Sequence, residues 1–475
     1  MKSWMRNGLC LALCLAWLSA GGCKSLKPGE CESDFDCRGQ VKGVAACYKE
    51  PPDAGIGKCM SVKDARAALA RYQRRISGKC QDKDKDGVKA GDGCLPAQDC
   101  PGGLCDCDDS DPAIKPGARE ICDIKDNDCD EELNEGLRGC VGTLLGGKQD
   151  PVMKFMTIMT AGVEVVPNGD VYISDEHRIY RMDHGTRQIK RVAGSDKPGN
   201  DNRQGKLARF DRPRGMVMDA AGYLYIADCG NNCIRRLAPD GKVSTWAGKC
   251  SSESDDTGLD QDGDWQSARF WCPIDVDIDK DGNLIVADLL NSKIKRIGKD
   301  RRVTTIAGIG GQEDEEGYVV HGFADGPALK KARFNEPAGV AVAGDGSIYI
   351  ADSKNNCIRR LKDGKVNTFA GKCVSGSDKG GFKDGKARKA LFKLPNSVDV
   401  DARGAVWVAD TGNHCIRLIS GGQVITVAGQ HGQQGYYDGP LKDAVFNIPQ
   451  TISVAADGTV YVVDNGNYRV REFKR

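Results

Sequence analysis

Short hydrophobic runs alternate with polar turns through residues 141–475, and the clearest unit surrounds residues 346–371. In that unit, apolar or β-rich runs fall at 340–342, 347–351, 357–361 and 366–370, with Asp-Gly at 363–364 between the last two. An Asp-Gly pair between such runs favours a tight hairpin, because glycine adopts the positive φ that the turn requires. The pattern therefore predicts four short antiparallel strands in each unit.

The unit recurs six times along the chain, and each copy ends its second strand on an aspartate. These aspartates are Asp175, Asp228, Asp288, Asp352, Asp410 and Asp464. A unit that recurs at a nearly regular interval, as these aspartates do, is typical of stacked or radially arranged repeats. Four antiparallel strands per repeat form a propeller blade, an arrangement that leaves few exposed sheet edges. The sequence predicts a mainly β fold built around a six-bladed β-propeller.

Residues 409–419, ADTGNHCIRLI, resemble the NHL repeat, whose pattern runs close to ADTGNHRIR, and the resemblance covers residues 141–475. In that family the aspartate and the following Gly-Asn fold the loop between the second and third strands through side-chain to backbone bonds, which suits Asp and Asn in turns. The six aspartates are therefore interpreted as structural, with catalysis as the alternative.

The sixth repeat ends at Arg475 directly after its third strand, so its outer strand is missing. Residues 141–146, VGTLLG, are similar to 303–308, VTTIAG, and no inner strands precede them. We expect strand 141–146 to complete the last blade and close the ring of the 141–475 propeller. A phenylalanine also precedes a proline by three residues between successive blades, and we expect each of these rings to plug the space between two blades.

The chain begins with a pattern typical of a secretory signal over residues 1–22. Lys2 and Arg6 precede an apolar run at 8–18 that is too short to cross a membrane. Residues 18–23, LSAGGC, resemble a bacterial lipobox, which implies lipid on Cys23, although Ala20 stands where leucine is usual. Lys24 replaces the aspartate that would retain a Gram-negative lipoprotein in the inner membrane. The prediction is an outer-membrane or cell-surface lipoprotein, with an ordinary secreted protein as the alternative.

The 22 cysteines are far more than a cytosolic chain carries, so disulfides are expected in an exported protein. A small Cys-rich module is predicted at 23–60 and a helical spacer at 61–79. In the propeller, two cysteine pairs flank corresponding hairpins and a third joins equivalent positions on neighbouring blades. The predicted bridges are Cys233–Cys250, Cys357–Cys373 and Cys229–Cys272. Cys415 is expected to be free, because His431 stands where its partner would be.

Residues 80–140 form an Asp- and Cys-rich segment. It starts with DKDKDG at 82–87, the beginning of a calcium loop in which Asp82, Asp84 and Asp86 would point to one side. Gly93 occupies the position of the usual final glutamate, so further ligands are needed. Hard oxygen donors at this density favour calcium over zinc or copper.

Residues 105–135 resemble a metal-binding motif repeated in many exported bacterial proteins, of the form DCDD-x-DP…DNDCDG. The resemblance implies that its aspartates bind metal, with departures from the pattern at Glu131 and Asn134. The matching aspartates are Asp106, Asp108, Asp109, Asp111, Asp123, Asp126, Asp128 and Asp130. Crowded carboxylates repel one another unless a cation neutralises them, so we expect structural calcium. The alternative is a disulfide-bonded acidic linker without a specific site.

Three innermost strands carry an acid at equivalent positions, namely Glu164, Asp277 and Asp399. If these side chains face the channel, they could hold a divalent cation or a cationic ligand. The alternative is that they pair with solvent or with neighbouring main chain. The chain has five histidines, and no Ser-His-Asp or Cys-His order repeats at the blade tops.

Two functions therefore compete. The first is a surface-anchored binding or scaffold protein whose inter-blade loops contact a protein, peptide or glycan. The second is a metal-dependent, lactonase-like hydrolase or lyase that works at the channel. The net charge of +1 and the predicted export disfavour nucleic acid, and the membrane is contacted through the lipid anchor only. The sequence leaves the oligomeric state open.

Overall fold

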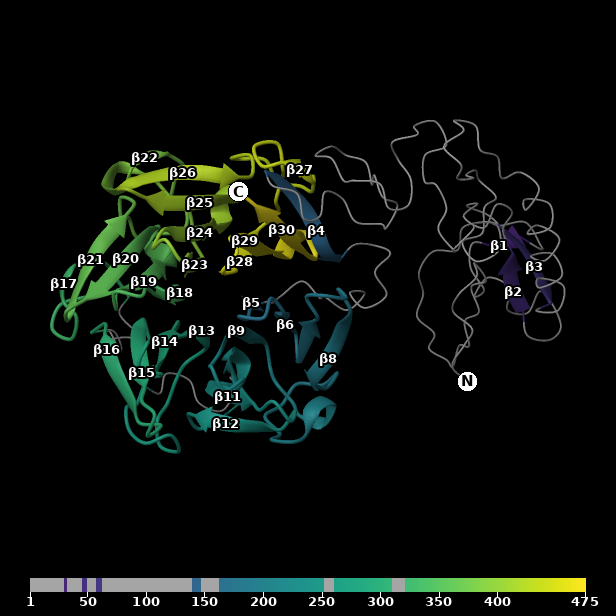
Figure 1. Cartoon of the computed structure of the whole chain (residues 1–475), viewed down its shortest axis with the longest axis horizontal. Coiled ribbons are helices and arrows are strands. Elements are labelled where there is room, and N and C mark those ends of the chain that lie inside the picture. The colour runs from purple at the N-terminus through teal and green to yellow at the C-terminus, as the bar shows by residue number, and fades with distance from the viewer. Residues whose placement is uncertain are drawn as a thin grey trace. The chain divides into compact units, whose positions relative to one another are not determined.

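The structure is a computed structural model that describes residues 139–146, 162–251, 260–309 and 321–475, together with three short strands near the N-terminus (Figure 1). These strands are β1 (Glu30–Cys31), β2 (Ala45–Tyr48) and β3 (Gly57–Ser61), and they form an antiparallel sheet in the order β1-β3-β2. The predicted helix at 61–79, apart from Ser61 at the end of β3, and the predicted metal-binding aspartates at 82–130 lie outside the described residues.

Six antiparallel sheets form a ring, which confirms the predicted six-bladed propeller (Figure 1). Blade 1 contains β5 (Val163–Val165), β6 (Val171–Asp175), β7 (Arg178–Met182) and β8 (Ile189–Gly194). Blade 2 contains β9 (Pro213–Met218), β10 (Leu224–Asp228), β11 (Cys233–Leu237) and β12 (Val243–Ala247). Blade 3 contains β13 (Pro273–Ile278), β14 (Leu284–Asp288), β15 (Lys293–Ile297) and β16 (Val303–Ala307).

The last three blades carry a short fifth strand on the outer edge. Blade 4 contains β18 (Pro337–Val342), β19 (Ile348–Asp352), β20 (Cys357–Lys362), β21 (Lys365–Ala370) and β17 (Gly326–Pro327). Blade 5 contains β23 (Ser397–Val400), β24 (Val406–Asp410), β25 (Cys415–Ser420), β26 (Gln423–Ala428) and β22 (Gly385–Lys386). Blade 6 contains β28 (Pro449–Val454), β29 (Thr459–Asp464), β30 (Arg469–Lys474), β4 (Cys140–Gly146) and β27 (Gly439–Pro440).

The ring is closed by β4, as the sequence predicts. This strand pairs with β30 in antiparallel register, so that Leu145 lies opposite Val470 and Val141 opposite Phe473. Val141, Leu144 and Leu145 are buried. The first and last strands of the propeller therefore share one sheet and one core.

Buried phenylalanines fill the spaces between blades. Phe334 packs with residues of blades 3 and 4, and Phe392 with residues of blades 4 and 5. All five rings that precede a proline are at most 3% exposed, namely Phe210, Phe270, Phe334, Phe392 and Phe446. The predicted core role is confirmed, and each ring joins two neighbouring sheets into one hydrophobic cluster.

Three disulfides join pairs of described cysteines in the propeller, and they are the three that the sequence predicts. Cys229–Cys272 joins the turn after β10 to the start of blade 3. Cys233–Cys250 and Cys357–Cys373 each tie the third strand of a blade to the segment that leaves its outer strand. Cys415 is free and buried, as expected. Intact disulfides are typical of an oxidising compartment.

The described helices are single 3-10 turns, and four of them follow the repeat aspartates. They are η2 (Gly205–Leu207), η3 (Cys229–Asn231), η4 (Ser353–Asn355), η5 (Ala387–Lys389), η6 (Thr411–Asn413) and η7 (Asn465–Asn467). Within the described part of the chain, none is long and apolar enough to cross a membrane.

Candidate functional site

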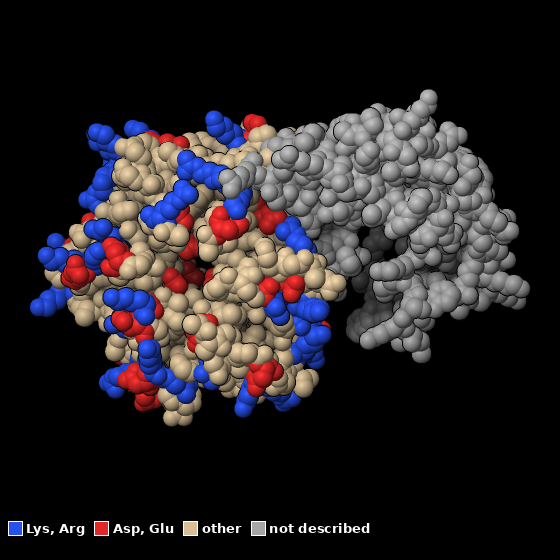
Figure 2. Space-filling view, in the orientation of Figure 1, with Lys and Arg blue, Asp and Glu red and all other residues tan. Residues whose placement is uncertain are grey.

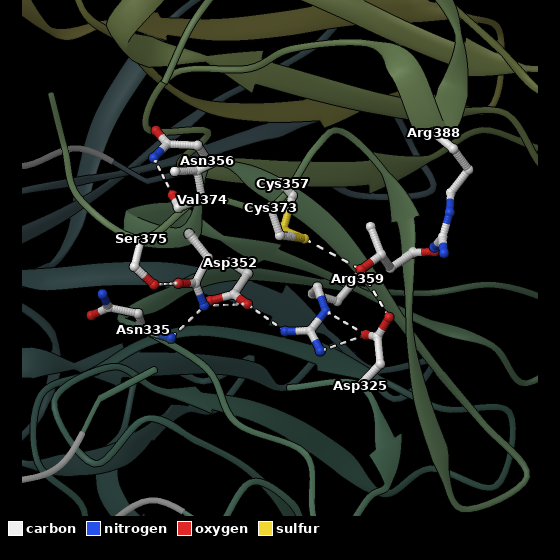
Figure 3. Close-up of a disulfide and its surroundings, with 12 residues drawn as sticks. Asp325, Asn335, Asp352, Asn356, Cys357, Arg359, Cys373, Val374, Ser375 and Arg388 are labelled. Carbon is white, nitrogen blue, oxygen red and sulfur yellow. Dashed lines mark hydrogen bonds and ion pairs between the residues drawn. A yellow bond between two sulfur atoms is a disulfide. The ribbon is translucent and has the colours of Figure 1, made fainter. Parts of the chain in front are cut away.

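The repeat aspartate organises the inside of each blade, and blade 4 shows how (Figure 3). One oxygen of Asp352 accepts the backbone N–H of Asn335 at 2.8 Å. The other accepts the side chains of Asn355 at 2.9 Å and Arg359 at 2.6 Å. Arg359 is fully buried and also binds Asp325 at 2.7 Å. Every donor aimed at Asp352 comes from its own repeat, so the network fixes the blade rather than a ligand.

The same network recurs in the other blades that carry the full motif. The ion pairs are Arg235–Asp228, Arg359–Asp352, Arg417–Asp410 and Arg471–Asp464, at 2.5–2.9 Å, and Lys295 lies 3.5 Å from Asp288 in blade 3. All five cations are fully buried. Burial raises the pKa of Asp410 to about 6, which leaves it ionised at pH 7 beside Arg417. These contacts support the structural interpretation of the aspartates.

The buried arginine was missed from the sequence, although a signal existed. It lies seven residues after the aspartate in four blades, and lysine occupies that position in blade 3. Aromatic rings enclose it: the guanidinium of Arg417 lies 4.6 Å from the ring centre of Phe382 and 5.0 Å from that of Phe392. The cation recurs at a fixed distance after the repeat aspartate, and an aromatic residue precedes each blade. Together these two features could have indicated a cation held between aromatic rings.

Blade 1 departs from this pattern, as its shorter DEHRI loop suggests. Asp175 is buried and neither carboxylate oxygen accepts a hydrogen bond, while the nearest Arg178 nitrogen lies 3.4 Å away. Burial raises the pKa of Asp175 to about 7. The loop chemistry of blade 1 is therefore less complete than that of its neighbours.

The predicted inner-strand acids converge on the central channel, where a fourth acid joins them. Glu164, Asp277 and Asp399 line one cavity together with Asp275. Figure 2 shows Asp and Glu atoms near the centre of the propeller. Asp275 was not predicted, although it lies two residues before Asp277 and therefore on the same side of its strand. None of the four acids has a Lys or Arg nitrogen within 4 Å among the described residues.

Three of these acids bind main chain, which is the alternative that the sequence left open. Asp277 accepts the N–H groups of Ile278 and of Val342 in the next blade, both at 2.6 Å. Asp399 does the same with Val400 and with Val454 of the next blade, both at 2.6 Å. The edge of an innermost strand has no further strand to pair with, so its N–H groups need other acceptors. The carboxylates supply them and link neighbouring blades.

Asp275 and Ser453 also accept backbone N–H groups, whereas Glu164 accepts a serine hydroxyl instead. Asp275 accepts the N–H groups of Val276 at 3.0 Å and Val340 at 2.9 Å. The hydroxyl of Ser453 accepts the N–H of Val165 at 3.0 Å and donates to Glu164 at 3.4 Å. Glu164 thus joins blade 6 to blade 1 through a serine rather than directly.

Burial in the channel disfavours the charged form of all four acids. Desolvation raises the pKa of Asp275 to about 8, that of Asp399 to about 7 and that of Asp277 to about 6. Desolvation and the charges of its three neighbours hold the pKa of Glu164 well above its usual range. At neutral pH the channel therefore retains protons that the same groups would lose in water.

The cavity is small, and the acids that line it are bound within the protein. Among the described residues, no three His, Cys, Asp or Glu side chains are placed to hold a metal together. The cavity measures about 40 Å³, which is room for about three water molecules at ~10–15 Å³ each. Glu164, Asp277 and Asp399 thus share a cavity without forming a set of metal ligands.

Ser292 and His321 form a hydrogen-bonded pair, an arrangement that can activate a serine as a nucleophile. Ser292 Oγ lies 2.7 Å from His321 Nδ1. However, Ser292 is fully buried, so a substrate carbonyl has no access to it. Its positive φ of 52° recurs at the same place in other blades, as at Asn356 and His414, and therefore belongs to the repeat.

The raised pKa values predict a particular pH dependence of stability. The folded acids bind protons that the unfolded chain releases near pH 4, so the free energy of unfolding should fall as pH rises from about 4 to about 8. Asp275→Asn cannot ionise and should flatten part of this slope. Urea unfolding at pH 5 and pH 8 measures it, with the exposed Asp281→Asn as the control. Equal slopes in both variants would contradict the assignment.

Comparison with known families agrees with this geometry. The NHL repeat model matches residues 446–473, which identifies the fold as an NHL β-propeller. The model of the teneurin NHL domain matches residues 168–420, more than half of the 475 residues, and the chain belongs to this family. A third model, described as "Putative metal-binding motif", matches residues 106–135, the segment that resembles such a motif in the sequence.

The chain spans only a small part of the length of the curated relatives that it matches. The chain is 26% identical over 300 residues to Protein SUPPRESSOR OF QUENCHING 1, chloroplastic, of Arabidopsis thaliana, covering 60% of this chain and 27% of that protein. It is 27% identical over 243 residues to mouse Teneurin-1, covering 47% of this chain and 8% of the relative. An auxiliary nutrient binding protein from Bacteroides thetaiotaomicron matches with a TM-score of 0.49 and 15% identity, over 70% of this chain and 75% of that one.

Proposed function

We propose that this chain is an exported binding or scaffold protein whose propeller presents rigid outer surfaces to a partner. The observation that carries the proposal is the state of the channel. Asp275, Asp277 and Asp399 accept backbone N–H groups of neighbouring blades, and Glu164 accepts the Ser453 hydroxyl. The cavity of about 40 Å³ is far below the ~300–1,000 Å³ typical of small-molecule sites. The lactonase-like alternative requires a metal and a substrate in that space.

Rigidity supports a role in surface binding. Disulfides fix the segments that leave blades 2 and 4. Asn356 and His414 each accept a backbone N–H from the connection that leads from their own blade to the next, at 2.9 and 3.0 Å. A surface that is already ordered loses less conformational entropy when a partner binds. Loops on a stable propeller are therefore suited to recognition.

The N-terminal segment completes the proposal. Calcium bound by the aspartates between Asp82 and Asp130 stabilises that segment, and lipid on Cys23 anchors the chain to the outer membrane or cell surface. The matched metal-binding motif and the acidic composition support the first point. The lipobox-like sequence and the disulfides support the second.

A calcium titration coupled to a turnover assay tests the proposal. We compare the wild-type chain with the triple variant Glu164→Gln, Asp277→Asn and Asp399→Asn. Both should bind the same number of calcium ions by calorimetry and neither should hydrolyse lactones or esters, because the channel acids serve the main chain. The variant Asp106→Asn, Asp108→Asn serves as the positive control and should lose calcium.

Two results would contradict these expectations, and only the first would overturn the binding function. Turnover in the wild type that disappears in the triple variant would establish the enzyme. Loss of one calcium ion in the triple variant, without turnover, would place a cation in the channel and leave the binding function standing.

A further inference from the structure

A strip of positive charge runs along the connection from β21 to β23, on the outer edge of blade 5. Its six side chains are exposed, and they are Lys372, Lys379, Lys383, Lys386, Arg388 and Lys389. We call them the basic strip. Figure 2 shows Lys and Arg atoms along the propeller edge where Figure 1 places β22.

The charge of the basic strip is not neutralised by the protein. Among the described residues, no carboxylate lies within 4 Å of any of its six cations, and Arg388 donates only to the backbone oxygen of Thr368. The connection contains two acids, Asp378 and Asp384. Asp384 is bound by Arg417 at 2.6 Å, so Asp378 alone remains to offset six positive charges.

The fold does not require this charge, as the next connection shows. Between β26 and β28, residues 430–448 contain a single lysine, Lys442, and two aspartates. Both connections nevertheless keep the same structural parts: an aspartate bound to the buried arginine, here Asp438 with Arg471, and a plug phenylalanine, here Phe446. The basic strip is therefore an addition to the repeat rather than part of its framework.

The chemistry of the strip indicates a flexible polyanion that is held by charge. Five of its six cations are lysines, which act as hydrated point charges without a fixed bidentate geometry. The aromatic residue within it offers no stacking surface, because Phe382 lies between Arg417 and the parallel ring of His431, 4.0 Å away. Single-stranded nucleic acids are normally held by base stacking as well as charge, so the strip fits them poorly.

The arrangement of the charges narrows the partner further. All six cations follow one connecting segment, so they form a line that a chain-like polyanion can follow. Four of the residues among the cations are glycines, at 376, 380, 381 and 385, which add no side chain to the segment. We propose that the basic strip binds an acidic polysaccharide, a sugar chain that bears carboxylates or sulfates. This inference rests on the binding function proposed above and names the class of its ligand.

The test uses charge reversal with a matched control. The strip variant is Lys379→Glu, Lys383→Glu, Lys389→Glu, and the control is Lys206→Glu, Lys280→Glu, Lys299→Glu, three exposed lysines on other blades with the same change in net charge. Polygalacturonate and heparin serve as probes, with binding measured by calorimetry at several salt concentrations. The strip variant should bind about tenfold more weakly or worse at low salt and show a smaller salt dependence.

Each outcome decides the proposal. Equal loss in the strip and control variants would mean that only net charge matters, which overturns it. Stronger strip-dependent binding to phosphatidylglycerol vesicles or to single-stranded DNA would replace the polysaccharide with that partner. If the strip variant does not melt like the wild type, Lys→Gln changes at the same positions repeat the test. Lactone turnover that requires the channel acids would overturn the binding function without altering this result.

Discussion

Arg417→Ala should destabilise the propeller by about 3–5 kcal/mol. The guanidinium is fully buried, pairs with Asp410 at 2.5 Å and with Asp384 at 2.6 Å, and lies between two aromatic rings. Removing it leaves Asp410 as an uncompensated buried charge and also leaves a cavity. Thermal or urea unfolding of the purified chain measures the loss.

Two further variants distinguish the loss of the buried ion pair from the general effect of removing an arginine. Arg403→Ala removes an exposed arginine of the same blade and should change stability by less than ~0.5 kcal/mol. Adding Asp410→Asn to Arg417→Ala removes the orphaned charge and should recover part of the loss. If Arg417→Ala were as mild as Arg403→Ala, the buried pair would not support the blade.

Deleting residues 141–146 should lower the melting temperature by many degrees. The deletion removes β4, exposes the unpaired edge of β30 and takes Val141, Leu144 and Leu145 out of two hydrophobic clusters. Each such side chain contributes roughly 1.5–3 kcal/mol when fully buried. Calorimetry of the deleted and intact chains is the direct measurement.

Two point variants test the packing of a β4 side chain without removing the strand. Leu144→Ala, at a position 2% exposed, should cost about 2–5 kcal/mol, whereas Leu329→Ala, at a position 60% exposed, should cost almost nothing. An unchanged melting transition after the deletion would rule out ring closure by this strand.

The repeats explain why much of the propeller could be predicted from the sequence. A hydrophobic pattern seen six times averages out local ambiguity, and the strands expected at 347–351 and 366–370 lie within one residue of β19 and β21. The disulfides were also predictable, because equivalent positions in related hairpins imply equivalent distances. Repetition similarly revealed the closing strand, since the sixth copy lacked its fourth strand.

The repeat pattern predicts where the channel acids lie but does not predict what they bind. Three acids at equivalent positions indicate a shared location, but whether they bind an ion or the main chain depends on distances of a few tenths of an ångström. Asp275 could have been predicted by alternation, because it lies two residues before Asp277 on the same side of β13. The role of the buried arginines depends on how far each side chain reaches, which a repeat pattern does not specify.

The closing strand also has a consequence for the order in which this protein can be assembled. β4 is made before every other propeller strand, yet its partner β30 is the last strand of the chain. Until synthesis delivers that segment, β4 lacks the strand that it pairs with and its leucines lack part of their packing. Contacts between such distant segments form slowly, and exposed strand edges favour aggregation. The ring is therefore most vulnerable to misfolding before its last residues arrive, and a C-terminal truncation should impair folding more than its length suggests.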